Sequence, residues 1–290
     1  MTRLSIIGVG RIGGEVAYLT ALQKLVDEIF LYDISSSLLK SQILDLQHAD
    51  LDVTITTEIK DFYTSDVCVF SAGMPRNPSV KTRADLLFAN LPAVTQWGRY
   101  LKKFEGNLIT VTNPMDINNY ILWKYSELEK NRCIGFGGQL DSARFGIELK
   151  NIDISEPAWV LGEHGEHQVP FFSSFSQNVP SDIREKILAN LRSSSMQVIH
   201  GKAGTVFGPV RHIASLVDAI VADKREILPC SCILDGEYGI CDCSLGVPAK
   251  LGREGIISII EKPLDEWERG HLSEAGEFAQ SLCKNELVVR

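Results

Sequence analysis

Short apolar runs alternate with longer amphipathic stretches through the first half of the chain. The runs have the length and the bounding turn residues of strands, and the stretches between them repeat apolar residues at helical spacing. We expect strands at residues 4–8, 28–32, 53–56, 67–71, 108–112 and 133–136. We expect helices after residue 13 and at residues 35–49 and 84–104. Strands that alternate with helices predict an α/β fold with a doubly wound parallel sheet, which binds its ligand at the carboxyl ends of the strands.

The second half has a different pattern. Helical spacing of apolar residues recurs between shorter strand-like runs. The expected strands are residues 158–161, 168–175 and 244–247, with a hairpin over residues 230–243, and the expected helices are residues 181–199, 209–221 and 263–282. We therefore expect an α+β domain over residues 139–290, following an α/β domain over residues 1–138.

A glycine-rich turn joins the first strand to the first helix. It is Gly8-Val9-Gly10-Arg11-Ile12-Gly13, and Asp33 ends the next strand twenty residues further on. Gly8 permits the tight turn, Gly10 lets the backbone approach a pyrophosphate at the helix N-terminus, and Gly13 lets the helix pack on the strand. Asp33 would accept hydrogen bonds from the adenosine ribose, and its charge would repel a 2'-phosphate. This arrangement predicts NAD as the cofactor in preference to NADP.

The densest group of chemically useful side chains lies at residues 162–167, together with residues 140–144. His164 is able to transfer a proton near neutral pH, and Asp141 to orient its ring. Arg144 offers a planar fork that matches a carboxylate. Asp141 and Arg144 lie three positions apart, so they project from the same face of a helix. We interpret His164 and Asp141 as a catalytic pair.

Other interpretations of this region stay open at the level of sequence. Glycine-flanked histidines also occur in plain surface turns, and Asp-x-x-Arg occurs in solvated helix pairs. A second interpretation takes Glu163, His164, Glu166 and His167 as metal ligands. Gly165 argues against the helix on which a His-Glu-x-x-His site is built, so we expect no metal.

A polar segment at residues 74–82 carries Arg76 and Lys81, and Arg83 follows it. Such a segment is either a solvated connector or a lid that brings arginines to an anionic substrate and excludes water when it closes. Asn113 falls at the carboxyl end of another predicted strand, where a sheet of this kind binds its ligand.

Composition excludes several classes of function. The 290 residues are 44% hydrophobic, enough for a sizeable core, and the formal net charge is -8. An acidic chain disfavours non-specific binding to nucleic acid, which needs a basic face. No apolar run approaches the length that crosses a bilayer, and the N-terminus lacks the pattern of a signal peptide. We therefore expect a cytoplasmic protein with no membrane partner.

The seven cysteines are an odd number, which speaks against a secreted disulfide framework. Four of them form Cys230-x-Cys232 and Cys241-x-Cys243 on the two sides of the predicted hairpin. A zinc or iron site is one interpretation, but structural zinc sites usually use Cys-x2-Cys. We favour small buried side chains, because free cysteine packs as a hydrophobe.

With these motifs in place, the sequence resembles the lactate/malate dehydrogenase family, and within it the archaeal-type malate dehydrogenases. The resemblance covers nearly the whole chain. It rests on six blocks in the same order, namely the glycine turn with Asp33, residues 72–76, residues 83–87 with Asn90, and residues 111–114, 140–144 and 162–165. It implies a Rossmann-type NAD-binding domain, a following substrate-binding domain, and assembly as a homodimer or homotetramer.

The resemblance also implies roles for individual residues. His164, oriented by Asp141, would take the hydroxyl proton of the substrate while hydride passes to NAD. Arg144 would bind the carboxylate next to the reacting carbon, and Arg83 on the lid would polarise the carbonyl. Asn113 would hydrogen-bond the substrate. The cofactor contacts would come from Gly8, Gly10, Gly13, Asp33, Asn90, Val111, Thr112 and Asn113.

Substrate choice in the family depends on the lid position that matches Arg76. Arginine there favours a dicarboxylate such as malate or oxaloacetate, and Ala203 matches a position that is small in malate enzymes. Arg76 and Arg83 are seven positions apart where the family usually has six, so alignment backwards from Arg83 would place Asn77 there instead. The resemblance implies action on L-malate. The alternatives are an L-lactate or broader 2-hydroxyacid dehydrogenase, and an NAD-binding subunit without turnover.

Overall fold

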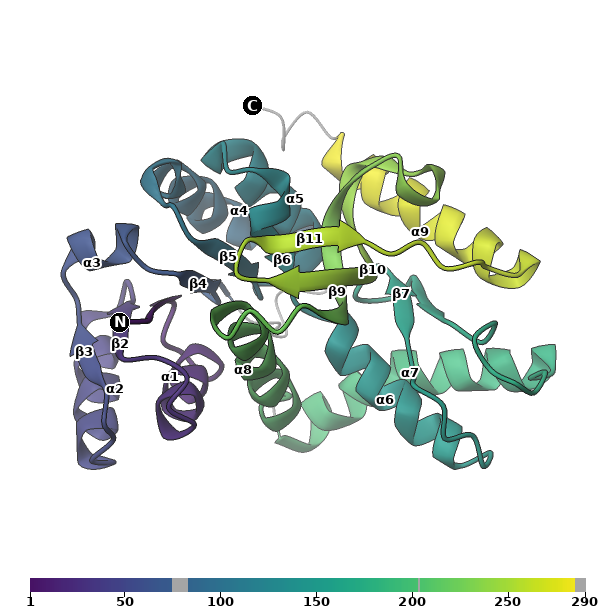
Figure 1. The fold of residues 1–290 in the computed structure, drawn as a ribbon, viewed down its shortest axis with the longest axis horizontal. Coiled ribbons are helices and arrows are strands. Elements are labelled where there is room, and N and C mark those ends of the chain that lie inside the picture. The colour runs from purple at the N-terminus through teal and green to yellow at the C-terminus, as the bar shows by residue number, and fades with distance from the viewer. Residues whose placement is uncertain (75–82, 203, 285–290) are drawn as a thin grey trace.

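The computed structural model describes residues 1–74, 83–202 and 204–284. The strands of these residues form one eleven-stranded sheet in the order β3-β2-β1-β4-β5-β6-β9-β10-β7-β8, with β11 paired to β10 (Figure 1). Neighbours from β3 to β6 are parallel, and the later pairs are antiparallel. This mixed sheet with helices on it confirms the predicted fold class.

In the first half, strands alternate with helices as the sequence pattern predicts. The strands are β1 (Arg3–Ile7), β2 (Glu28–Tyr32), β3 (Thr54–Thr56), β4 (Val67–Phe70), β5 (Asn107–Thr110) and β6 (Cys133–Gly135). The helices are α1 (Gly13–Leu22), α2 (Ser36–His48), α3 (Ile59–Tyr63), α4 (Arg83–Tyr100) and α5 (Met115–Ser126), with 3-10 turns at Leu101–Lys103 and Lys130–Arg132. The strand order reverses between β1 and β4, which is where a doubly wound sheet opens a crevice for its ligand.

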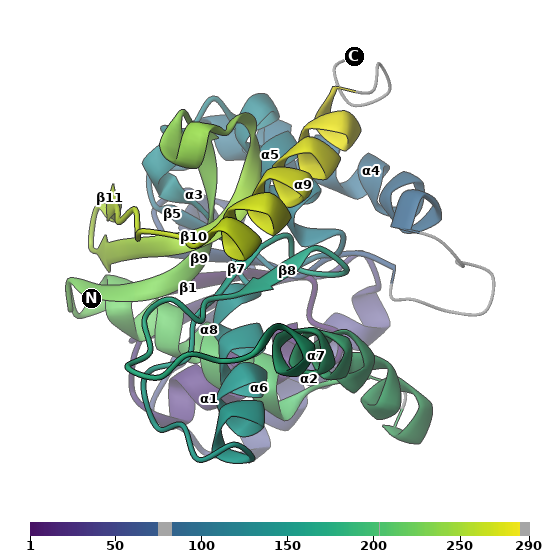
Figure 2. The same ribbon diagram turned by 90° about the vertical axis from the view of Figure 1, so that its right-hand side faces the viewer.

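Among the described residues, the second half combines a long hairpin with three shorter strands and four helices. Its strands are β7 (Val160–Gly162), β8 (Gln168–Pro170), β9 (Glu226–Asp235), β10 (Cys241–Gly252) and β11 (Gly255–Ile259). Its helices are α6 (Gly138–Lys150), α7 (Ser181–Lys202), α8 (Phe207–Val221) and α9 (Glu266–Cys283), with a 3-10 turn at Glu237–Gly239. Figure 2 shows β7 and β8 between α9 on one side and α6 and α7 on the other.

The two halves meet within the sheet. β6 pairs with β9 through Gly135 and Ser231. A Cβ on Gly135 would lie 2.5 Å from the Cβ of Ser231 and 2.4 Å from the sulfur of Met115, so only glycine permits this approach. One hydrophobic cluster extends from Leu4 on β1 to Cys283 on α9, and therefore belongs to both halves. The predicted boundary at residues 138 and 139 remains a prediction.

One predicted strand is too long. The run expected at residues 168–175 ends as a strand at Pro170. Glu268 of α9, which is fully buried, accepts hydrogen bonds from the backbone N–H groups of Phe172 (2.6 Å) and Ser173 (2.8 Å). A carboxylate from the end of the chain thus takes the place of a neighbouring strand, and apolar spacing alone does not reveal it.

The cysteine pattern does form adjacent strands, with Cys232 opposite Leu245 and Cys230 opposite Val247. Cys230, Cys232 and Cys243 are buried, as we expected of small packing residues, whereas Cys241 is exposed. The strand predicted separately at residues 244–247 is the middle of β10.

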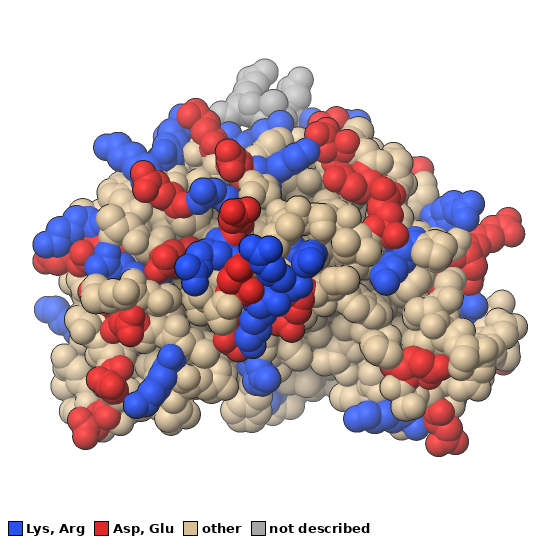
Figure 3. Space-filling model, in the orientation of Figure 1, with Lys and Arg blue, Asp and Glu red and all other residues tan. Residues whose placement is uncertain are grey.

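The surface mixes charges of both signs. On the face shown in Figure 3, basic and acidic side chains are interspersed. Ion pairs such as Lys224 with Asp218 and Arg225 with Asp223 neutralise charge locally. Among the described residues, none of the helices combines the length and the apolar character that a bilayer span requires.

Candidate active site

The glycine turn between β1 and α1 has two packed positions and one open position. A Cβ on Gly8 (φ +89°) would lie 2.5 Å from backbone atoms of Ala72, and one on Gly13 would lie 1.9 Å from the carbonyl oxygen of Gly8. A Cβ on Gly10 would meet nothing within 4 Å. Backbone therefore borders open space at Gly10, next to the N-terminus of α1, which is what a bound pyrophosphate requires.

Asp33 lies just beyond β2 and borders the same turn. Its two carboxylate oxygens accept hydrogen bonds from the backbone N–H groups of Val9 (3.0 Å) and Ser35 (2.8 Å). These bonds fix a half-buried negative charge beside the glycine turn. The position fits a dinucleotide whose ribose carries free hydroxyls, because each oxygen retains lone pairs for further donors.

The carboxyl ends of β4 and β5 are tied together from α4. Asn90, which is buried, accepts a hydrogen bond from the N–H of Met74 (2.6 Å) and donates one to the carbonyl of Asn113 (2.8 Å). Thr112 donates to the carbonyl of Ala72 (2.7 Å). Asn90 and Thr112 therefore brace the strand ends, while the side chain of Asn113 is exposed there and Val111 is half-buried.

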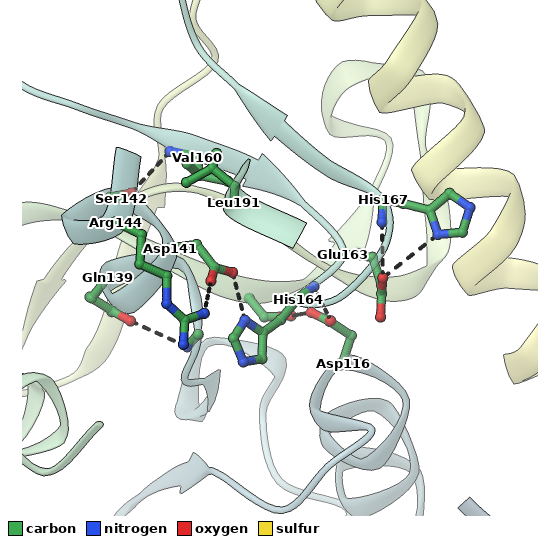
Figure 4. A network of polar contacts seen from close by, with 12 residues as sticks. Asp116, Gln139, Asp141, Ser142, Arg144, Val160, Glu163, His164, His167 and Leu191 are labelled. Carbon is green, nitrogen blue, oxygen red and sulfur yellow. Dashed lines mark hydrogen bonds and ion pairs between the residues drawn. The ribbon is translucent and has the colours of Figure 1, made fainter. Parts of the chain in front are cut away.

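The predicted catalytic pair is in contact (Figure 4). Nδ1 of His164 lies 2.6 Å from Oδ2 of Asp141, and Nη1 of Arg144 donates to Oδ1 of the same carboxylate at 3.0 Å. Asp141 and Arg144 are one helical turn apart on α6 and share the face that points to His164, as their spacing predicts. Three residues that were selected on chemical grounds thus form one cluster.

The environment of Asp141 keeps it ionised. Burial acts to raise the pKa of Asp141, but the adjoining His164, through its charge and its hydrogen bond, and then Arg144 outweigh burial and hold that pKa below its usual value. An ionised carboxylate accepts the Nδ1–H of neutral imidazole. Nε2 of His164 is then the ring nitrogen that can take up a proton.

The backbone of His164 is held as firmly as its ring. Its N–H donates to Oδ2 of Asp116 (2.8 Å), and its carbonyl accepts from Nη2 of Arg83 (2.7 Å). Gly137 (φ +152°) lies against the imidazole, where a Cβ would come within 2.5 Å of the ring. Sequence reasoning missed Asp116 and Gly137. The only signal for Asp116 was an acidic residue in the first turn of a helix that follows a strand end.

Glu163 organises the turn that presents His164. It is fully buried, forms an ion pair with Arg83, and accepts hydrogen bonds from the backbone N–H groups of Glu166 (3.1 Å) and His167 (3.3 Å). These contacts occupy the carboxylate that the metal interpretation would use. Among the described residues no group of three His, Cys, Asp or Glu side chains gathers in a way that could hold a metal ion.

Arg83 is the first residue of α4, so the structure places it beside the catalytic turn rather than out on a loop. Arg76, Asn77 and Ala203 lie outside the described residues. The expectations that rest on these three residues therefore remain predictions.

Comparison with known proteins matches both halves of the chain. Residues 2–135 match the model of the lactate/malate dehydrogenase NAD-binding domain, and residues 139–285 match the α/β C-terminal domain of the same family. The chain belongs to the lactate/malate dehydrogenase family. With the NAD-binding domain present, it is an NAD-dependent oxidoreductase, which confirms the predicted cofactor and class of enzyme.

Individual members of the family are similar over almost their whole length. Malate dehydrogenase from Halobacterium salinarum is 39% identical over 300 residues, which cover 96% of this chain and 97% of that protein. The structure of malate dehydrogenase from Archaeoglobus fulgidus in complex with NADH has a TM-score of 0.89 and 34% identity, covering 97% of this chain and 98% of the other. A lactate dehydrogenase from a Medee basin deep-sea metagenome library also has a TM-score of 0.89, with 27% identity and coverage of 97% and 98%.

Proposed function

We propose that the chain is an L-malate dehydrogenase, which interconverts malate and oxaloacetate with NAD. The observation that carries this proposal is the contact of His164 with Asp141, with Arg144 on the same carboxylate. An imidazole with one nitrogen engaged, next to a cation that matches a substrate carboxylate, is what oxidation of a 2-hydroxy acid requires. The family members at 31–39% identity that are named malate dehydrogenase favour this substrate over lactate.

The proton moves through His164. In oxidation, Nε2 accepts the hydroxyl proton of malate as the C–O single bond becomes the C=O double bond of oxaloacetate. In reduction, the imidazolium returns this proton to the carbonyl oxygen. NAD supplies the acceptor for the hydride that leaves the same carbon. Asp141 stabilises the imidazolium that forms, because its carboxylate lies 2.6 Å from Nδ1 and stays ionised.

Arginine side chains bind the substrate in this proposal. A guanidinium has five N–H donors, so Arg144 can keep its bond to Asp141 and still bind the carboxylate next to the reacting carbon. Glu163 holds Arg83 against the backbone of His164, and we assign to Arg83 the polarisation of the substrate carbonyl. We assign the second carboxylate of malate to Arg76, and a hydrogen bond to the substrate to Asn113.

The glycine turn and the strand ends form the NAD site in this proposal. Gly8, Gly13 and the open position at Gly10 shape the cradle for the pyrophosphate, and Asp33 binds the ribose. Val111, Thr112 and Asn90 line or brace the strand ends nearby. Because the charge of Asp33 repels a 2'-phosphate, NADH should be used in preference to NADPH. The family resemblance leads us to propose a homodimer or homotetramer as the assembly.

Initial rates with oxaloacetate and with pyruvate, each with NADH and with NADPH, test the proposal. We expect kcat/KM for oxaloacetate with NADH to exceed the other three combinations by at least about 100-fold, since a site that pairs a charge with the second carboxylate discriminates strongly against an acid that lacks it. Arg76→Gln should shift the ratio towards pyruvate. A preference of the unaltered enzyme for pyruvate would refute the malate assignment and leave a lactate or broader 2-hydroxyacid dehydrogenase.

A further inference from the structure

Asp116 is a buried carboxylate that no step of the proposed reaction uses. It lies in the first turn of α5 and is 1% exposed. Oδ2 accepts the backbone N–H of His164 at 2.8 Å, and Oδ1 accepts the hydroxyl of Ser231 at 2.5 Å. One side chain therefore joins three segments that are remote in sequence, namely α5, the turn after β7, and β9. Figure 4 shows Asp116 beside His164.

The hydrogen bonds continue from Asp116 back to the coenzyme half. The hydroxyl of Ser231 lies 2.8 Å from that of Ser244, which accepts from Nδ2 of Asn119 at 2.9 Å. Asn119 in turn accepts from the hydroxyl of Thr110 at 2.8 Å. All these side chains are buried, so the bonds form in a low dielectric where a missing partner is expensive. Thr110 ends β5, three residues before Asn113.

Burial of an acidic residue at this position costs free energy, and hydrogen bonds to its carboxylate oxygens must offset that cost. Burial raises the pKa of Asp116 in spite of its bonds from Ser231 and His164, so the environment opposes the charge. An apolar side chain would fill the space without that cost, but it would leave the N–H of His164 without an acceptor. The acceptor, rather than the packing volume, explains the residue.

We propose that Asp116 is a positioning residue for proton transfer, which fixes the backbone of His164 relative to the end of β5 where Asn113 lies. This inference rests on the proposed role of His164. Asp141 fixes the rotation of the imidazole ring about the side-chain bonds of His164. Asp116 fixes the position of the backbone from which that ring extends. A displacement of about 1 Å at a reacting group lowers a rate by roughly 100-fold.

Replacements at Asp116 separate the acceptor from the charge. In Asp116→Asn, the amide oxygen can accept from His164 and the amide nitrogen can donate to Ser231, whose hydroxyl can turn towards Ser244. In Asp116→Ala and Asp116→Leu neither bond is available. Asp116→Leu keeps the branched shape at Cγ, leaves no cavity, and serves where the alanine variant fails to fold.

Glu268→Ala is the matched control. Glu268 is also a buried carboxylate that accepts backbone N–H groups, those of Phe172 and Ser173, but it lies on α9 away from the catalytic pair. Its loss should lower the melting temperature by the same physical route without moving His164. Any effect on kcat that exceeds this control is then due to position rather than to general loosening.

The experiment measures kcat and KM with oxaloacetate and NADH, the Kd of NADH by fluorescence, and deuterium exchange at the amide of His164 by mass spectrometry. We expect Asp116→Ala and Asp116→Leu to lose roughly 100-fold in kcat, with the Kd of NADH changed by less than about twofold, and to exchange the His164 amide faster. Asp116→Asn should recover most of the activity and of the protection.

Two results would overturn the inference. One is a loss of kcat in Asp116→Ala and Asp116→Leu no larger than in Glu268→Ala, and the other is an asparagine variant as inactive as these two. Amide exchange does not depend on the substrate, so the hold on His164 is measured even if the unaltered enzyme fails to reduce oxaloacetate. That last failure would reject the proposed function alone.

Discussion

The two sides of the candidate active site are built in different ways. The coenzyme side comes from one continuous unit, β1, the glycine turn, α1 and β2, whose key residues Gly8 to Asp33 lie close in sequence. The proton-transfer side is assembled from α4, α5, α6, the turn between β7 and β8, and β9. Local backbone shape therefore defines the first side, and long-range polar contacts define the second. We expect substitutions on the first side to weaken cofactor binding and substitutions on the second side to lower kcat.

The largest expected effect separates chemistry from binding. His164→Asn should lower kcat for oxaloacetate reduction by about 1000-fold, within the range that a general acid or base contributes, because the amide cannot carry the proton. NADH should still bind with a Kd within about twofold of the original. His48→Asn, at an exposed position on α2, is the control. Retention of full activity by His164→Asn would refute the proton-transfer role.

Two glycine substitutions should sharpen the contrast between the sides. Gly137→Ala places a Cβ within 2.5 Å of the His164 ring at a φ of +152°, so kcat should fall roughly 10- to 100-fold while the Kd of NADH stays unchanged. Gly10→Ala should leave the melting temperature unchanged, because its Cβ meets no protein atom. It should instead weaken NADH binding about tenfold, about 1.4 kcal/mol, by filling space meant for the pyrophosphate. Equal effects of the two variants on kcat would contradict the division.

The smallest expected effect concerns the two acids that hold His164. Burial raises the pKa of Asp116. Because of this residue, the folded protein loses stability as pH rises from the ordinary carboxyl pKa to the raised pKa. The pKa of Asp141 is lowered because His164 and Arg144 outweigh burial, so its contribution is present above the ordinary value and is lost as pH falls through the lowered one.

The melting temperatures of variants at Asp116 and at Asp141, each taken relative to the unaltered protein, should therefore change in opposite directions between about pH 3 and 7, by a few degrees. Relative to the unaltered protein, Asp116→Asn should become more stable as pH rises, and Asp141→Asn less stable. Asp52→Asn, at a side chain that is 91% exposed, should show no such trend. Parallel trends for Asp116→Asn and Asp141→Asn would show that the two carboxyls do not differ in this way.

The extent to which the sequence predicts this molecule follows from the same contrast. The parallel strands, the glycine turn and Asp33 were predictable because a period, a turn and a short spacing determine them. His164, Asp141 and Arg144 were recognisable by their chemistry, and the family resemblance supported the grouping. The bond from His164 to Asp116 joins positions 48 apart, and the bond from Arg83 to Glu163 joins positions 80 apart. Neither is visible in any local pattern.

The same reason accounts for the strand that ended early. Apolar spacing extends past Pro170, but the donors of Phe172 and Ser173 are satisfied by Glu268, which is 96 positions from Phe172. Both Glu268 and Asp116 are carboxylates that become buried only in the completed fold. Their contacts therefore cannot be predicted from local sequence. Sequence patterns describe elements well and describe their polar cross-connections poorly.

The pairing of Gly135 with Ser231 has one more consequence. Because the sheet and the main hydrophobic cluster pass from one half into the other, neither half can melt and leave its neighbour intact. Heat should therefore unfold the molecule in one cooperative transition. Occupation of the glycine turn should then slow the opening of α9, an element of the other half, since a ligand stabilises the whole of whatever unit unfolds together.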